Sequence, residues 1–345
     1  MDNSAAAFSV ETGRRVAGEG ALPGLVFAFR FEADGRAREL RLDTPPEFAA
    51  DAGAWFWLHF NLADKRACQL IAAAAEVPAA ARSLLVALHD HQQLYATADC
   101  IYGVFSDLVR DFDRVGEQTG YLNFAMTEQL VVTGRHQPLQ AVEAVRTALA
   151  GGRRTPTAAT LIEAMVEQAT VGIDRLLEDL ARELDQIEDM LLIDSIADER
   201  RRIGRVRRTG VRLHRQLAAL RVLLDRFDVS EEIAIAPAIS IATDRLVQRL
   251  DALDQEVGSI QERARLLQEE VGARLSEETN RSLNALAVVT ALFLPPTLVT
   301  GVFGMNTTAL PFSESHHGSV WAIGMAVGAA ALAYWLLRRL GVIRS

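Results

Sequence analysis

The sequence has little that would support a disulfide scaffold, a thiolate metal centre or a nucleic-acid surface. Its 345 residues include two cysteines, Cys68 and Cys100, too few and too far apart for a disulfide framework or a zinc knuckle. Aromatic residues make up 6% of the chain, and the formal net charge of −9 leaves no basic surplus for a phosphate backbone. Apolar residues still make up 50%, so the composition is that of a folded chain. The net negative charge argues against nucleic acids as partners.

Charge is also missing from one long stretch near the C-terminus. Residues 282–337 contain no lysine or arginine, and Glu314 is their only charged side chain. As helices, residues 283–303 would span about 31 Å and residues 320–337 about 27 Å, and each length suits a bilayer core of about 30 Å. The pattern predicts a lipid-embedded pair of transmembrane helices joined by a loop at 304–319. A buried hairpin in a soluble core is the alternative.

The basic residues that flank the two spans predict their orientation. Arg274 and Arg281 precede the first span, and Arg338, Arg339 and Arg344 follow the second. The loop between the spans has no lysine or arginine, so the positive-inside rule predicts that both termini are cytoplasmic and the loop is external. Residues 1–19 hold no apolar run of the kind found in a signal peptide, which agrees with this orientation.

The part of the chain before the membrane divides into two. Up to residue 155, strand-like segments bounded by turn residues alternate with Ala-rich helical segments, which predicts a small α/β domain. The strand-like segments are 25–31, 54–60, 94–109 and 124–133, and the helical ones include 64–76 and 139–150. After a breaker cluster at 151–156, we expect residues 156–281 to form a helical bundle and stalk, and residues 282–345 to form the membrane domain.

Apolar residues in the helical part alternate in steps of three and four, the spacing of helices that pack against one another. Two such series cover residues 203–227 and 246–271, and the segment 157–192 is comparably amphipathic. No proline lies between residue 243 and Pro295, so one helix of about 60 residues, roughly 90 Å long, can run from the cytoplasm into the membrane. Such a rod could transmit a cytoplasmic event to the first span.

The first span carries polar and small residues that a plain anchor does not need. Seven positions fall on one narrow face, and we call them the polar stripe: Asn280, Leu283, Ala287, Thr290, Leu294, Thr297 and Gly301. Pro295 and Pro296 also deprive two carbonyl groups of helical partners, which lipid tolerates only where neighbouring chains or water satisfy them. The stripe predicts the lining of a water-filled path, with a small-residue packing face as the alternative. Two spans cannot enclose a pore, so a path requires several copies around a symmetry axis.

The outer end of this span resembles a known family. Residues 293–306, Phe-Leu-Pro-Pro-Thr-Leu-Val-Thr-Gly-Val-Phe-Gly-Met-Asn, are similar to the end of the first membrane helix in the CorA superfamily of divalent-cation transporters. Residues 57–60, residues 249–265 and Asn280 are also similar in order and spacing. The resemblance implies an α+β cytoplasmic domain, a long helical stalk and two transmembrane helices, assembled as a homopentameric funnel.

The resemblance also implies roles for particular residues. It places Asn306 at the outer mouth, with Gly304 and Met305 shaping the turn there, and Asn280 at the inner end of the path. Five amide oxygens could accept hydrogen bonds from metal-bound water without stripping the hydration shell. It further implies a bacterial inner membrane as the location, no cofactor, and a divalent cation as cargo.

The loop after the signature departs from the magnesium-channel pattern. Relatives of that kind tend to have Met-Pro-Glu, whereas residues 310–312 are Leu-Pro-Phe and lack the carboxylate, which is more similar to the ZntB branch associated with zinc and proton-coupled uptake. His316 and His317 beside Glu314 supply ligands that zinc prefers more than magnesium does. An ordinary solvent-exposed loop is the alternative for these three residues. Neither span contains an ionisable side chain that could carry a coupled proton.

Other candidate sites are weaker. Residues 89–91, His-Asp-His, could bind a metal, but a turn between elements is the favoured interpretation. A run of carboxylates could form regulatory cation sites between subunits or simply a solvated helix face: Glu163, Glu167, Asp174, Glu178, Asp185, Glu188 and Asp189. No nucleotide, phosphate-loop or nucleophile motif supports an enzyme. The sequence therefore predicts a zinc or divalent-cation transporter, with a magnesium or cobalt channel and a non-conducting membrane scaffold as alternatives.

Overall fold

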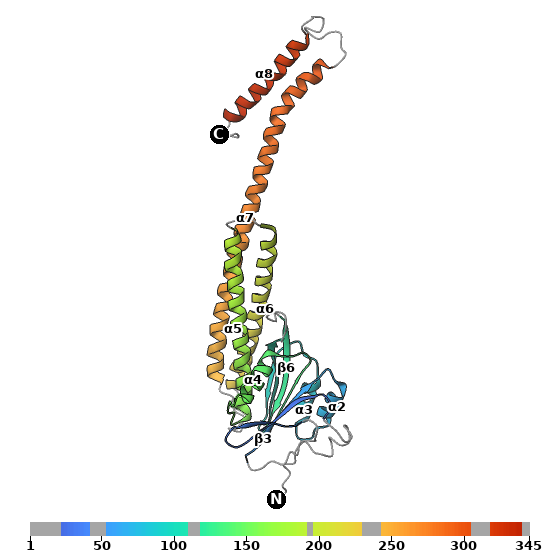
Figure 1. The fold of residues 1–345 in the computed structure, drawn as a ribbon, viewed down its shortest axis with the longest axis vertical. Coiled ribbons are helices and arrows are strands. Elements are labelled where there is room, and N and C mark those ends of the chain that lie inside the picture. Colours follow the sequence, from blue (N-terminus) through green and yellow to red (C-terminus); the bar gives the residue numbers. More distant parts are fainter. Residues whose placement is uncertain are drawn as a thin grey trace. The chain divides into compact units, whose positions relative to one another are not determined.

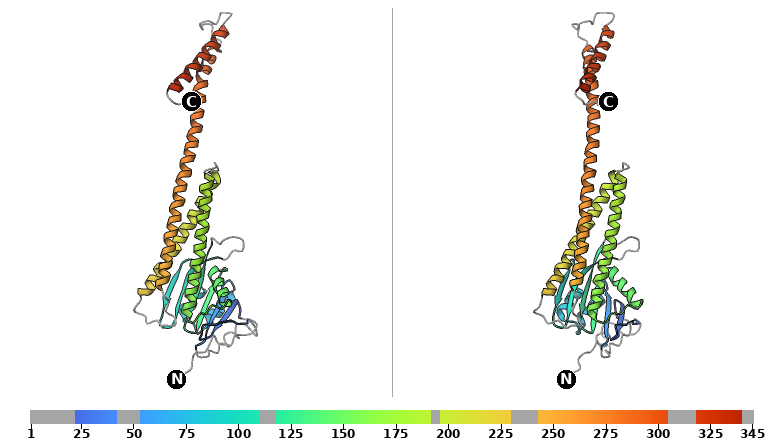
Figure 2. Two further views of the ribbon diagram at one scale, coloured as in Figure 1. Left: turned by 60° about the vertical axis from the view of Figure 1, so that its left-hand side comes forward. Right: turned by 90° about the vertical axis from the view of Figure 1, so that its left-hand side faces the viewer.

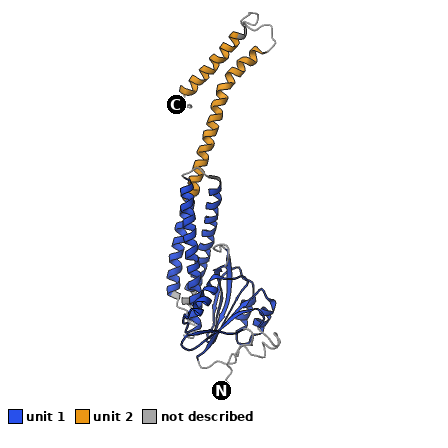
Figure 3. Cartoon of the chain, in the orientation of Figure 1, with its two compact units in different colours: residues 1–265 blue, residues 266–345 orange. Residues whose placement is uncertain are grey.

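The computed structural model describes residues 22–41, 53–109, 118–191, 196–229, 243–304 and 318–339. The chain divides into two compact units, residues 1–265 and residues 266–345, coloured separately in Figure 3. One helix, α7, contributes its first part to the first unit and its last part to the second. The three-part division expected from the sequence stays a prediction.

The first unit contains a seven-stranded sheet and the helices around it (Figure 1). The strands are β1 (Leu25–Phe31), β2 (Ala37–Glu39), β3 (Trp55–Asn61), β4 (Gln93–Ala96), β5 (Ile101–Leu108), β6 (Thr119–Met126) and β7 (Leu130–Arg135). Their order in the sheet is β2-β1-β3-β7-β6-β5-β4, and β3 and β7 pair in parallel while the other neighbours are antiparallel. The helices of this unit are α2 (Lys65–Ala73), α3 (Ala79–Val86), α4 (Gln140–Ala150), α5 (Ala158–Leu191), α6 (Ile196–Val229) and the first part of α7 (Thr243–Phe303).

Two expected strands are each divided by a turn. The segment predicted as one strand at 94–109 is the hairpin β4–β5, because the backbone turns at Thr97, whose N–H and hydroxyl both donate to the Cys100 carbonyl. The segment predicted at 124–133 belongs to β6 and β7, because Thr127 closes a similar turn onto Leu130. Both turns carry polar residues, Asp99 in the first and Glu128 and Gln129 in the second, and these mark the breaks that the two expected strands overlook.

The central strand β3 is buried at every position from Trp55 to Phe60. One face contributes Phe56, Leu58 and Phe60 to a core shared with α2 and α3. The other face presents Trp57 and His59, which stack with Phe29 and Phe27 of β1, respectively. A strand covered on both faces explains why this segment is so apolar.

His59 is a fully buried polar residue that the surrounding structure satisfies. Its Nε2 accepts a hydrogen bond from Arg135 Nε at 3.1 Å, so its proton lies on Nδ1, which contacts Thr133 Oγ1 at 2.8 Å. Trp57 Nε1 donates to the same Thr133 oxygen at 2.8 Å. Burial, with smaller effects of nearby arginines, holds the pKa of His59 well below its usual range. His59 is therefore a neutral structural residue of the sheet, which gives residues 57–60 a structural role.

Asp107, at the end of β5, caps a helix that begins far away in the sequence. Leu139 precedes α4 and offers it no side-chain cap, whereas Asp107 Oδ2 accepts a hydrogen bond from the Ala141 N–H at 2.7 Å. Asp107 Oδ1 accepts from the Leu108 N–H at 2.7 Å. Burial raises the pKa of Asp107 to about 7, although the backbone N–H groups act in the opposite direction.

Replacing Asp107 with asparagine is expected to lower the free energy of unfolding by about 1–3 kcal/mol. Each carboxylate oxygen accepts one backbone N–H, and the NH2 group that replaces one of these oxygens cannot accept a hydrogen bond. The raised pKa means that the folded state keeps a proton that the unfolded state loses near pH 4. Wild-type stability should therefore fall as pH rises from about 4 to about 7, by at most about 1.4 kcal/mol per unit. Thermal unfolding of the full chain in detergent, followed by tryptophan fluorescence, measures both effects.

The Asp107→Asn variant should lack this part of the pH dependence. Asp99→Asn, in an exposed turn, is the control and should change neither the stability nor its slope. An unchanged pH slope in Asp107→Asn would show that Asp107 is ionised in the folded state throughout this range.

Helices α5, α6 and α7 pack along the apolar series that the sequence predicts. The buried side chains include Ile203, Val206, Leu213, Leu217 and Leu224 of α6, and Leu246, Leu250, Leu253, Val257, Ile260 and Ala264 of α7. At Gly210 a Cβ atom would lie 3.0 Å from Gln261 Cγ, so the absence of a side chain lets α6 and α7 approach closely there.

The second unit contains the last part of α7 and the helix α8 (Gly318–Arg339). The predicted helix of about 60 residues is confirmed, since α7 has 61 residues and continues through Pro295 and Pro296 to Phe303. In Figures 1 and 2, α8 runs back alongside the last turns of α7, so the two form an antiparallel hairpin.

Candidate functional site

The end of α7 and the whole of α8 present apolar side chains that a single chain does not cover. Leu283, Phe293 and Leu298 of α7 are 58%, 64% and 66% exposed, and Val320 and Ile323 of α8 are 65% and 64% exposed. Both helices are long and apolar enough to cross a membrane. Covering a side chain of this size with lipid or protein is worth about 1.5–3 kcal/mol, so this hairpin is built for a bilayer or for contact with other copies.

All seven residues of the polar stripe lie on the exposed surface of α7. Thr290 Oγ1 donates to the carbonyl of Leu286 at 2.8 Å, and Thr297 Oγ1 donates to that of Phe293 at 2.7 Å. With its proton used inside the helix, each hydroxyl oxygen keeps lone pairs that point away from the helix. Such oxygens can accept hydrogen bonds from the water shell of a cation, whose bound waters are strong donors.

The two prolines add uncharged acceptors to the same part of α7. Pro295 and Pro296 have no N–H for the carbonyls of Ala291 and Leu292, yet the helix continues without a break. The hydroxyl of Thr300 donates to the Thr297 carbonyl at 3.0 Å, so it does not serve either of these two carbonyls. Free carbonyl oxygens at this depth need a partner from water or from a neighbouring chain, so they favour an assembly over a lone anchor.

The proposed outer mouth is described only in part. Gly304 follows the end of α7, and its N–H donates to the Thr300 carbonyl at 2.9 Å, which closes the last turn of the helix. The remaining predicted residues of the mouth and loop lie outside the described residues: Met305, Asn306, Glu314, His316 and His317. Their roles stay predictions.

The His-Asp-His segment at 89–91 lies in the connection between α3 and β4, and its histidines serve local contacts. His89 Nε2 is 2.8 Å from the Leu84 carbonyl oxygen, and His91 Nδ1 is 2.7 Å from Asp90 Oδ1. Across the described residues, no three His, Cys, Asp or Glu side chains are grouped so as to hold a metal ion. The turn is therefore the better interpretation of this segment.

Arginines of α7 occupy several of the α5 carboxylates that the sequence offers as cation sites. Arg249 pairs with Asp174 at 2.8 Å, and Arg263 bridges Glu188 at 2.6 Å and also Asp185. The bonds from Glu188 and Asp185 raise the pKa of Arg263, so its charge is permanent. Within one chain, these carboxylates already have a cationic partner, and a divalent ion would have to displace a guanidinium.

Removing the Arg263 charge is expected to create a weak divalent-cation site. Arg263→Gln would leave Asp185 and Glu188 side by side on α5 without their partner, and two such carboxylates bind Mg²⁺ or Zn²⁺ in the millimolar range. The loss of stability should stay within about 1 kcal/mol, since these side chains are partly exposed. Isothermal titration of the full chain with Mg²⁺ measures the new site.

Arg265→Gln is the matched control, because Arg265 pairs with Glu262 on its own helix. It should add no site. Equal Mg²⁺ binding by wild type and Arg263→Gln would show that the carboxylates bind cations despite the arginine.

An α+β unit continued by one long helix and closed by an apolar hairpin defines a membrane protein with a large water-exposed part. Residues 52–339 match the family described as CorA-like Mg2+ transporter protein, and the chain belongs to that family. The family consists of divalent-cation transporters rather than enzymes. The resemblance of residues 293–306 is confirmed, and so is the expected fold of the single chain, an α+β domain followed by a long helix and a terminal apolar helix.

Individual relatives are similar at lower levels of identity. The divalent cation transporter CmaX of Pseudomonas aeruginosa is 30% identical over 215 residues, which are 61% of this chain and 64% of CmaX, so the match spans just under two thirds of that protein. The zinc transport protein ZntB of Photorhabdus laumondii is 22% identical over 288 residues, 82% of this chain and 86% of that protein.

Solved structures share the fold. The structure of full-length CmaX aligns with a TM-score of 0.74 at 24% identity, covering 94% of this chain and 99% of that chain. The CorA magnesium transporter of Methanocaldococcus jannaschii aligns with a TM-score of 0.67 at 16% identity, covering 92% and 99%. At these identities the likeness concerns the fold alone.

Proposed function

We propose that this chain transports divalent cations through a path lined by α7, with zinc as the preferred cargo. The observation that carries the proposal is the exposed polar stripe on the uncharged end of α7, in a chain of the CorA family. Membership of a transporter family argues against the non-conducting scaffold.

The proposed path handles a hydrated ion rather than a bare one. A wall without charged side chains gives no strong binding site at which the ion would be trapped, and the outward-facing threonine oxygens accept hydrogen bonds from bound water. Asn306 would act as the polar ring at the outer mouth, Asn280 would mark the inner end, and Leu283 and Leu294 would form apolar constrictions between them.

The path requires several copies, and we propose a homopentamer in the bacterial inner membrane with both termini in the cytoplasm. Each copy would contribute α7 to the wall, with α8 outside it. Support comes from the exposed apolar surface of both helices and from the arginines at the ends of the spans, including Arg281, Arg338 and Arg339. Proton coupling is proposed only as uptake alongside zinc, since neither span has a carboxylate, histidine, lysine or arginine that could carry the proton.

Zinc is favoured over magnesium by the loop after the signature and by the similarity to proteins named ZntB. A magnesium or cobalt channel is the second candidate, favoured by the family description. Uptake of Zn²⁺, Mg²⁺ and Co²⁺ into proteoliposomes, with and without a pH gradient, separates the two. Equal lack of uptake for all three ions would end the transport proposal.

Changing His316 and His317 together to alanine should raise the half-saturating zinc concentration several-fold, because imidazole is a ligand that zinc prefers. The constants for magnesium and cobalt should change less. The measurement is initial uptake as a function of ion concentration for each variant. Equal shifts for the three ions would leave both histidines as ordinary loop residues.

A further inference from the structure

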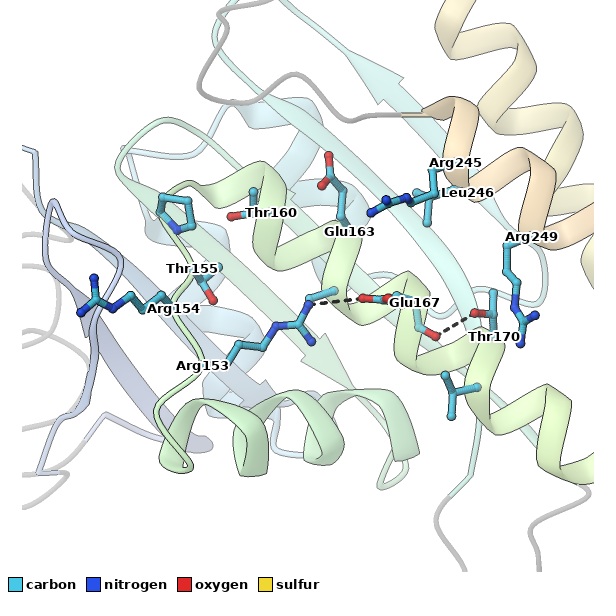
Figure 4. Close-up of a pocket in the computed structure, with 13 residues that line it drawn as sticks. Arg153, Arg154, Thr155, Thr160, Glu163, Glu167, Thr170, Arg245, Leu246 and Arg249 are labelled. Atoms are coloured by element: carbon cyan, nitrogen blue, oxygen red, sulfur yellow. Dashed lines mark hydrogen bonds and ion pairs between the residues drawn. The ribbon is translucent and has the colours of Figure 1, made fainter.

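A cleft of about 620 Å3 lies in the first unit between the start of α5 and the start of α7 (Figure 4). Its charged lining consists of Arg153, Arg154, Arg245 and Arg249, with Glu163 and Glu167. We call it the arginine cleft. It lies in a different unit from the polar stripe, and the proposed path makes no use of it.

The segment that carries the first two arginines is fixed to the sheet. Thr155 is buried, and its N–H donates to the Gly35 carbonyl at 2.8 Å. Gly35 has a φ of +78°, and a Cβ there would lie 3.0 Å from the backbone of Thr155 and Pro156, so only glycine allows this approach. Arg153 and Arg154 therefore start from an anchored backbone.

The carboxylates of the cleft do not balance its arginines. Arg153 pairs with Glu167 at 3.3 Å, as drawn in Figure 4, and Arg249 pairs with Asp174. Arg245 forms no ion pair or hydrogen bond within the part of the chain that the structure describes. Arg154 forms none there either, although its charge, after the hydrogen bonds from Arg36, helps to lower the pKa of Asp34. In Figure 4 the Arg245 guanidinium points toward Glu163, and that of Arg154 points away from the other arginines. Four arginines thus line the cavity against two carboxylates, in a chain of net charge −9.

The N-termini of α5 and α7 add further positive charge to the arginine cleft. Ion pairs from Asp174 to Arg249 and from Glu188 to Arg263 show that α5 and α7 run in the same direction, so both present their N-termini to this region. The N-terminus of a helix carries a partial positive charge, which disfavours basic residues nearby. The first turn of α5 has no acidic residue, and the first turn of α7 has Asp244 next to Arg245. An anion in the cleft would stabilise both the arginines and the helix ends.

We propose that the arginine cleft binds the phosphate groups of a polyanion, such as inorganic polyphosphate or the phosphate chain of a nucleotide. Guanidinium groups bind phosphate oxygens in pairs, and the cleft has the volume of a small-molecule site. None of the described residues that line it is aromatic, so a nucleotide would be held by its phosphates and not by its base. The same arginines exclude the transported divalent cation.

The test is titration of the full-length protein with sodium tripolyphosphate in metal-free buffer. Wild type should give saturable binding, and the double variant Arg154→Gln/Arg245→Gln should weaken it by at least about tenfold. Arg175→Gln, an exposed arginine of α5 outside the cleft, is the matched control and should leave binding unchanged. If the double variant does not fold, hydrogen exchange of wild type tests the site instead. Exchange at residues 157–171 should slow when tripolyphosphate is added.

Further arms identify what occupies the cleft. Displacement of bound ATP by tripolyphosphate would support recognition of the phosphate chain. Binding of ATP that tripolyphosphate does not displace would overturn the proposal. Absence of saturable binding by wild type also overturns it. A third result would also overturn it: the oligomer of the double variant dissociates and wild type binds no anion. The cleft would then be occupied by a carboxylate of a neighbouring copy. None of these outcomes depends on transport, so failure here is distinct from failure of the proposed path.

Discussion

Asn306→Gly is expected to abolish zinc flux into proteoliposomes while the oligomer keeps its size in detergent. The amide oxygen at the outer mouth is proposed to accept hydrogen bonds from metal-bound water, and glycine removes that oxygen from every copy at once. Glycine also adopts the backbone conformations that asparagine favours at helix ends, so the turn after Gly304 should survive. The measurements are initial zinc uptake and size-exclusion chromatography.

The design separates a selective amide from a turn residue. Thr308→Gly, in the same loop, is the control and should transport zinc at close to the wild-type rate. Near wild-type flux in Asn306→Gly would mean that asparagine serves only to end the helix. Selectivity would then have to be sought along Thr290, Thr297 and Gly301.

The elements dominated by local pattern could be predicted from the sequence. The absence of proline between residue 243 and Pro295, together with the steps of three and four, predicted α7 as one helix, and its observed bounds are Thr243–Phe303. The absence of lysine and arginine at 282–337 predicted the two helices of the hairpin. These predictions succeed because periodicity and charge are properties of a single segment.

Features that join distant residues could not be predicted. Arg263 meets Glu188 across 75 positions, and nothing local to α5 reveals that its carboxylates have partners. The cap that Asp107 gives to α4 and the arginine cleft arise in the same way, from segments brought together by the fold. The fragment 89–91 illustrates the converse, since a promising local motif is satisfied by its immediate neighbours.

A cysteine placed on the polar stripe should make transport sensitive to a thiol reagent. Leu294 lies on the stripe and Val289 does not, because five residues separate them by about 140° around the helix axis. The two side chains are 62% and 51% exposed in the single chain, so exposure alone does not distinguish them. Only the proposed assembly does, by turning Leu294 toward the path and Val289 away from it.

Modification of Leu294→Cys with a cationic methanethiosulfonate should reduce zinc flux by at least about tenfold, because a charged adduct in an uncharged path repels the ion and narrows the passage. Modification of Val289→Cys should leave flux almost unchanged. Cys68→Ser serves as the background, and Cys100 can remain because burial raises its pKa to about 12 and keeps it as an unreactive thiol. Inhibition of Val289→Cys alone would place the path on another face of α7, and inhibition of neither would remove α7 from the wall of the path.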